Sequence, residues 1–122
     1  MSNQQSGPIA GKLDLVIEQG ADFTRTLTFT DSGGAAINIT GYTFRMQGRV
    51  NKSSTTTLFN YGTAQFTITG GTAGVVALSV AGSITAAYDF DTGVYDMEWV
   101  TPSGAIKRIL EGNITLSREV TR

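Results

Sequence analysis

Apolar and polar residues alternate in several short stretches of this chain, and segments rich in glycine and threonine separate them. One clear alternation covers residues 42–50, where Tyr, Phe, Met, Gly and Val alternate with Thr, Arg and Gln. Another begins at Gly93 and places Tyr95, Met97 and Trp99 on one face. A period of two residues is typical of a strand with one buried face. Both segments are therefore predicted to be half-buried β-strands.

The same pattern predicts further strands at 13–17, 23–29, 58–61, 66–69, 75–80 and 105–116. The last of these is expected to bend or bulge at Gly112. Around residues 83–88 the period changes, and Ile84, Ala87 and Tyr88 fall on one side at spacings of three and four, which predicts a single helical turn. Short strands with a turn about every 8 to 12 residues indicate a sandwich or a small barrel, and we favour the sandwich.

A local motif narrows the fold further. Asp91, Gly93 and Tyr95 stand in the D-x-G-x-Y spacing found at the tyrosine corner of immunoglobulin-like domains. The Tyr95 hydroxyl is expected to close the corner onto upstream backbone, with Gly93 permitting the close approach. The competing interpretation is an ordinary strand start. With the corner, the sequence predicts an all-β fold, an immunoglobulin-like antiparallel β-sandwich of about seven to nine strands with one short helical turn.

The length of 122 residues predicts one domain. We expect residues 1–12 to form a flexible N-terminal arm, because they are polar and broken by Gly and Pro, and residues 13–122 to form the β-sandwich. The chain has no cysteine, so Met97 stands where antibody domains carry a disulfide cysteine. Apolar volume has to replace that bond, and the predicted core is Phe23, Leu27, Phe29, Phe44, Met46, Leu78, Met97, Trp99 and Leu110.

Charge and composition exclude several classes of function. The net charge is −1 and the cations are scattered, which argues against nucleic acid as a partner. No stretch approaches the roughly 20 apolar residues of a membrane span, so no membrane partner is expected. Histidine and cysteine are absent, which removes the commonest general base, metal ligands and thiolate nucleophile. We therefore predict a protein that is not an enzyme and that uses no cofactor.

Carboxylate pairs are the remaining candidates for chemistry. Asp89 with Asp91 and Asp96 with Glu98 each stand two residues apart. A glycosidase needs two carboxylates that converge across a cleft, and neither pair offers this by itself. Solvated surface acids are the favoured interpretation. Calcium binding by Asp89 and Asp91 is left open as an alternative, since hard cations bind several oxygen atoms.

Protein contacts are predicted at three places. Leu58, Phe59 and Tyr61 follow a polar loop and form the first interface candidate. Arg45 and Arg49 share one face of a strand and suit an anion or protein contact, or else form the solvated side of a sheet. The arm at the N-terminus is a third candidate, with an ordinary chain end as the alternative.

Four stretches, at 13–23, 37–47, 91–99 and 108–117, run in an order that resembles small tailed-phage virion proteins. In particular they are similar to the immunoglobulin-like N-terminal domain of phage upper baseplate proteins, over residues 13–117. The baseplate proteins continue into further domains after this module, whereas this sequence stops at Arg122, so the mode of attachment is left open.

The resemblance implies a structural protein of the virion, assembled in the host cytoplasm. It implies an adaptor that attaches fibres or receptor-binding proteins to the tail or baseplate through protein contacts. The expected partners are other virion proteins, with multiple copies in a symmetric assembly. Alternatives are a capsid decoration or head-fibre protein, a carbohydrate- or receptor-binding module with Phe59, Tyr61 and Tyr88 as its platform, and a hydrolase built on the carboxylates.

Overall fold

The computed structural model describes residues 11–120. These residues form nine strands and one helical turn. The elements are β1 (Gly11–Lys12), β2 (Leu15–Glu18), β3 (Phe23–Thr28), β4 (Thr43–Arg49), β5 (Phe59–Tyr61), β6 (Phe66–Gly70), β7 (Val75–Val80), α1 (Gly82–Thr85), β8 (Thr92–Val100) and β9 (Ile106–Ser117).

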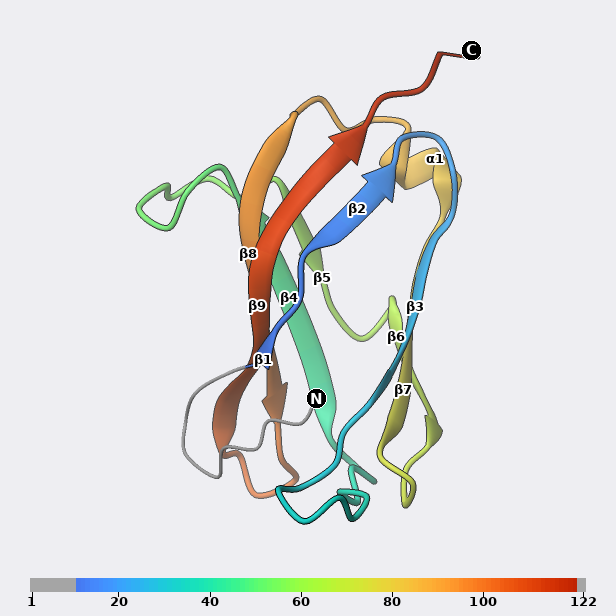
Figure 1. The fold of residues 1–122 in the computed structure, drawn as a ribbon, viewed down its shortest axis with the longest axis vertical. Helices are drawn as coiled ribbons and strands as arrows, with labels where there is room; N and C mark the ends of the chain where they lie inside the picture. The colour runs from blue at the N-terminus through green and yellow to red at the C-terminus, as the bar shows by residue number, and fades with distance from the viewer. Residues whose placement is uncertain (1–10, 121–122) are drawn as a thin grey trace.

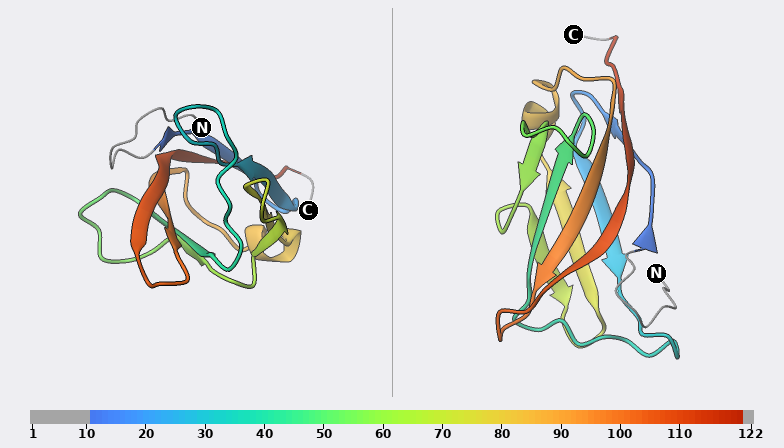
Figure 2. Two further views of the ribbon diagram at one scale, coloured as in Figure 1. Left: turned by 90° about the horizontal axis from the view of Figure 1, so that it is seen from below. Right: turned by 90° about the vertical axis from the view of Figure 1, so that its left-hand side faces the viewer.

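The strands form two sheets that face each other (Figures 1 and 2). The larger sheet has six strands in the order β1-β9-β8-β4-β5, with β2 also paired to β9. The smaller sheet has the order β3-β7-β6. This arrangement places β3, β7 and β6 opposite a sheet built around β4, β8 and β9, which is the topology of the immunoglobulin-like sandwich. The fold class predicted from the sequence is therefore confirmed.

One face of each strand packs between the sheets because the side chains alternate. β4 and β8 pair in antiparallel register, with Phe44 opposite Trp99 and Met46 opposite Met97. These four side chains are buried. The rings of Phe44 and Trp99 meet edge to face, with 6.4 Å between their centroids. Aromatic and thioether volume thus fills the place that a disulfide takes in antibody domains.

The core contains eight of the nine residues expected there, and Leu27 is half-buried against it. Several residues outside the predicted core are buried at least as deeply as the predicted ones. They include Ile17, Ile39, Val76, Val80 and Ile114, each 0% exposed. Burial of apolar side chains at about 25 cal/mol per Å² is the main source of stability in a chain without cysteine.

The chain enters the larger sheet earlier than expected. Gly11 and Lys12, assigned above to the arm, form β1 and pair with Leu110 and Glu111 of β9. β1 and β2 both run parallel to β9, so the sandwich is not antiparallel throughout. A parallel pair cannot be joined by a tight hairpin, and these partners come from opposite ends of the chain, where no hairpin is required. The rest of the expected arm lies outside the described residues.

The bulge in β9 lies at a different residue from the one expected. Met97 pairs with Leu110 and Glu98 with Arg108, so the extra residue is Ile109 and not Gly112. Ile109 and Leu110 are both buried, which regular alternation would forbid. Gly112 has another role, because a Cβ atom there would lie 2.7 Å from the carbonyl carbon of Leu13.

The Tyr95 hydroxyl does bind upstream backbone, but not at a corner next to its own strand. It donates a hydrogen bond to the carbonyl of Leu13, in the link between β1 and β2. The local corner is therefore a wrong prediction, and the bond instead fixes the first strands onto the sheet. Gly93 permits a close approach as expected, since a Cβ atom there would lie 2.6 Å from the carbonyl oxygen of Arg49.

The helical turn α1 closes one end of the sandwich beside the end of β2 (Figure 1). Its buried residue is Thr85, which is 0% exposed, whereas Ile84 is 43% exposed. The face predicted from Ile84, Ala87 and Tyr88 is thus wrong, because polar contacts to the β2–β3 link orient the turn. Among residues 11–120, no helix has the length and apolar character needed to cross a membrane.

Candidate functional site

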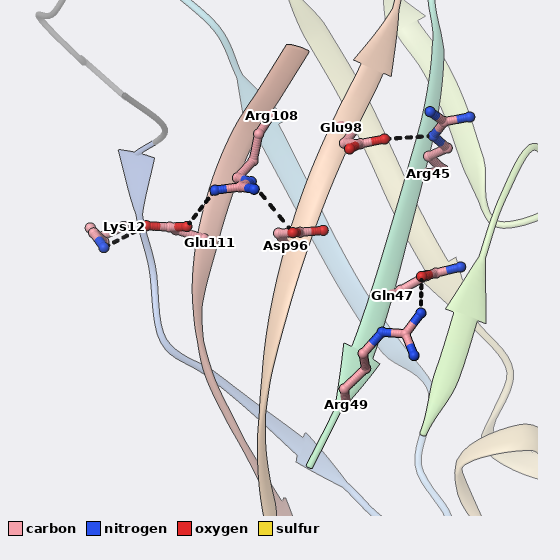
Figure 3. A network of polar contacts seen from close by, with 8 residues as sticks. All are labelled: Lys12, Arg45, Gln47, Arg49, Asp96, Glu98, Arg108 and Glu111. Atoms are coloured by element: carbon pink, nitrogen blue, oxygen red, sulfur yellow. Dashed lines mark hydrogen bonds and ion pairs between the residues drawn. The ribbon is translucent and has the colours of Figure 1, made fainter. Parts of the chain in front are cut away.

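Charged side chains gather on the outer face of the larger sheet. We call this surface the charged sheet face; it consists of Lys12, Arg45, Gln47, Arg49, Asp96, Glu98, Arg108 and Glu111 (Figure 3). It encloses a shallow hollow of about 500 Å³. Charged residues make up 16% of the chain, yet eight of the 13 residues that line the hollow are charged.

The strand register brings these side chains together. Arg45 lies opposite Glu98, and Gln47 lies opposite Asp96, across β4 and β8. Asp96 in turn lies opposite Glu111 across β8 and β9. Residues directly opposite each other on one face of a sheet have Cβ atoms about 5 Å apart, close enough for long polar side chains to pair.

Ion pairs connect three neighbouring strands, β1, β9 and β8. Lys12 and Glu111 are 2.5 Å apart, from Nζ to Oε2. Arg108 lies 3.4 Å from an oxygen of Asp96 and 3.5 Å from the other oxygen of Glu111. Exposed pairs of this kind contribute roughly 0 to 1 kcal/mol to folding. Stability therefore gives little physical reason to concentrate charge on this face.

The surroundings of the acids perturb their pKa values in opposite directions. The hydrogen bond from Lys12 holds the pKa of Glu111 below its ordinary value. Partial burial raises the pKa of Asp96, and the nearby Arg108 offsets part of this rise. Asp96 and Glu98 lie on the outer face of the sheet, as the sequence suggested, with side chains 44% and 32% exposed, and each lies beside an arginine.

Arg49 differs from the other arginines of this face. Its Nη2 donates a hydrogen bond of 3.0 Å to Oε1 of Gln47, and its Nη1 donates one of 3.1 Å to the carbonyl of Ser54. Both acceptors are uncharged. Arg45 instead binds a carboxylate, with 2.7 Å between its Nε and Oε1 of Glu98.

The predicted interface at Leu58, Phe59 and Tyr61 is wrong for two of its three residues. Phe59 is 6% exposed and Tyr61 is 2% exposed, while Leu58 is half-buried against the core. The Phe59 and Tyr61 rings stack with their centroids 4.5 Å apart. The Tyr61 hydroxyl lies 2.5 Å from that of Tyr88, and burial raises the pKa of both phenols. The same burial removes the aromatic platform that a carbohydrate-binding module would need.

Asp89 and Asp91 bind a side chain of the protein itself. Arg118 reaches Asp91 at 3.0 Å and Asp89 at 3.2 Å. These two hydrogen bonds raise the pKa of Arg118 above its ordinary value. Within residues 11–120, no three Asp or Glu side chains come close enough to hold a metal ion together. The guanidinium of Arg118 thus takes the place between the two carboxylates in which a calcium ion was considered.

Sequence reasoning named Arg45, Arg49, Asp96 and Glu98 but missed half of the charged sheet face. Lys12 was assigned to the arm, and Gln47, Arg108 and Glu111 were not singled out. A signal for Gln47 was present, because Gln47 alternates with Arg45 and Arg49 on β4 as Asp96 and Glu98 do on β8. That alternation does not predict that β4, β8, β9 and β1 lie side by side.

The strand order and this face define an immunoglobulin-like β-sandwich domain with one charged sheet surface. No family model matches the chain, and no curated protein sequence matches it. Its fold is similar to a solved structure from photo-crosslinking analyses of multimeric cell-adhesive interactions of VGSC beta subunits. That match has 14% identity and a TM-score of 0.43, over 88% of this chain and 92% of that one.

Extracellular domains 3–5 of Drosophila OTK are similar at 13% identity, with a TM-score of 0.34 over 92% of this chain. This chain spans 34% of that structure. Because these identities and TM-scores are low, the fold is assigned from the strand order of the two sheets and not from these matches.

Proposed function

We propose that this chain is a structural protein of a phage virion, an adaptor that attaches fibres or receptor-binding proteins to the tail or baseplate. The charged sheet face is the surface through which it contacts those proteins. One observation carries the proposal: in a chain with few charged residues, eight line a single hollow where they contribute little to folding. Complementary charges across an interface select the partner and fix its register.

The resemblance of residues 13–117 to the N-terminal domain of phage upper baseplate proteins supports the choice of a virion. Multiple copies arranged symmetrically turn individually weak contacts into a stable attachment. A position on the capsid, as a decoration or head-fibre protein, uses the same surface chemistry and differs only in the partner.

A binding role without catalysis agrees with the state of the carboxylates. Asp96, Glu98 and Glu111 each lie beside a lysine or arginine, and Asp89 and Asp91 share Arg118. A general acid or base has to reach a substrate proton at hydrogen-bond distance. Acids held by cations on a broad, shallow face are suited to recognition instead.

Photo-crosslinking combined with a density map of intact particles tests the proposal. A photoreactive amino acid replaces Gln47 in the charged sheet face, and Thr26, exposed on β3 of the smaller sheet, serves as the matched control. We expect particles to contain the chain, and the variant at Gln47 to crosslink to another virion protein far more than the variant at Thr26. Absence of the chain from all particles, or equal crosslinking from both faces, would contradict the proposal.

A further inference from the structure

Arg49 is a positioned guanidinium with unused hydrogen-bond donors. Its group has five N–H donors, and the structure assigns one to Gln47 and one to the carbonyl of Ser54. Within residues 11–120 the other three donors make no hydrogen bond, and Arg49 lies at the edge of the hollow. Because two bonds already fix the planar group, a ligand loses little entropy of the side chain when it binds there.

Among residues 11–120, the charged residues that line the hollow without an ion pair are two cations, Arg49 and Lys52, and one acid, Asp14. Asp14 accepts a hydrogen bond from the backbone N–H of Asn113. The acids Asp96, Glu98 and Glu111 are each engaged by a neighbouring cation, so the excess of unpaired charge is positive. Arg49 has two uncharged acceptors, and Lys52 is a second cation that lines the same hollow. The complementary ligand is therefore an anion, and a carboxylate matches the planar guanidinium with two parallel hydrogen bonds.

A protein side chain suits this place better than an acidic sugar. Sugars usually stack on exposed aromatic rings, and Phe59 and Tyr61 are buried. Among the described residues, Tyr95 is the only aromatic residue that lines the hollow; it is 4% exposed, and its hydroxyl donates a hydrogen bond to the carbonyl of Leu13. We infer that Arg49, together with Lys52, binds an Asp or Glu side chain presented by a partner protein. This inference rests on the proposed function and names the anchor within its surface.

Nuclear magnetic resonance titration tests the anchor directly. The probe is a capped tetraglutamate peptide at low ionic strength, and a capped tetraglutamine peptide is the neutral control. We expect saturable shifts at the Arg49 side-chain N–H and at the amides of Val94 and Asn113, which also line the hollow. Tetraglutamine is expected to cause none, because it lacks the charge.

Two variants separate the anchor from general attraction to a charged sheet. Arg49→Gln should weaken tetraglutamate binding by about tenfold or more, as expected for a charge-assisted hydrogen bond. Arg49→Lys keeps the charge without the planar fork and should fall between that variant and wild type. Lys107→Gln is the matched control, since Lys107 is exposed on β9 and does not line the hollow, and binding should stay within about twofold. Thermal unfolding of each variant confirms that it is folded.

Equal weakening by Lys107→Gln and Arg49→Gln would overturn the inference, as would undiminished binding by Arg49→Gln. If a sialic acid glycoside binds more tightly than tetraglutamate, the ligand of Arg49 is an acidic sugar and the inference of a protein side chain is wrong. The proposed function fails separately. If particles contain the chain and crosslink at Gln47 but tetraglutamate does not bind, only the anchor is wrong. If tetraglutamate binds and no particle contains the chain, only the virion role is wrong.

Discussion

Thr85 gives a sharp test of the polar contacts that hold the end of the sandwich. Its side chain is completely buried, and its Oγ1 accepts a 3.0 Å hydrogen bond from the N–H of Gly20. The same hydroxyl donates a 2.8 Å bond to the carbonyl of Ala21. These two bonds connect α1 to the link between β2 and β3, which lies about 65 residues earlier in the chain.

Valine has nearly the shape of threonine but cannot make either bond. With a net contribution of about 1 kcal/mol for each hydrogen bond, Thr85→Val should lower the free energy of unfolding by about 2 kcal/mol. Thr85→Ser keeps the hydroxyl and loses one buried methyl group, which costs about 1 kcal/mol. At roughly 4 °C per kcal/mol for a domain of this size, Thr85→Val should unfold about 8 °C below wild type.

Urea unfolding followed by tryptophan fluorescence measures the two variants against wild type. Ser83→Ala, on the exposed side of the same turn, is the control and should change the unfolding free energy by less than about 0.5 kcal/mol. Burial of apolar area alone predicts the opposite order, with valine harmless and serine worse. If Thr85→Val proves as stable as wild type, or more stable than Thr85→Ser, the polar contacts do not hold this end.

Further expectations concern the other places where the structure fixes its sheets. Tyr95→Phe removes the bond to the link between β1 and β2, and should cost about 1 kcal/mol and speed amide hydrogen exchange in β2; unchanged exchange would count against it. Gly48→Ala places a Cβ atom 2.5 Å from the Phe59 ring and should cost about 1 to 3 kcal/mol in urea unfolding. Gly62→Ala, with no atom within 4 Å, should cost far less. The lowered pKa of Glu111 gives stability that is present above its ordinary value of 4.5 and is lost as the pH falls through the lower folded value. Lys12→Met should raise the pKa of Glu111 in a side-chain titration by nuclear magnetic resonance, and should reduce the stability that is lost at low pH. An unchanged titration would refute the pairing of Lys12 with Glu111.

The period of two predicted the long strands well. In β8, Gly93, Tyr95, Met97 and Trp99 are all buried as their alternation requires. Backbone geometry alone sets this period, so it appears in the sequence whatever the neighbouring strand is. Periodicity failed where tertiary contacts compete with it, as at the bulged pair Ile109 and Leu110 in β9.

The interface candidates show a second limit. Phe59 and Tyr61 follow a polar loop, and a short apolar segment beside a loop has the same sequence whether it is exposed or buried. In the structure Phe59 stacks on Tyr88 and lies 6.5 Å from the ring of Phe90, and the Tyr61 hydroxyl pairs with that of Tyr88. Their burial depends on a segment nearly 30 residues further along the chain, and no local pattern encodes that distance.

The sequence by itself determined the all-β class, the faces of the long strands and the absence of histidine and cysteine chemistry. Those properties follow from residue type and local backbone geometry. Only the tertiary structure decided which charges meet, since Lys12, Asp96 and Glu111 become neighbours through the strand order and its register. The tertiary structure also decided that Arg45 pairs with the carboxylate of Glu98, whereas Arg49 binds the uncharged side chain of Gln47. Pairing across strands depends on contacts between residues far apart in the chain, so the charged sheet face exists only once the sheet has formed.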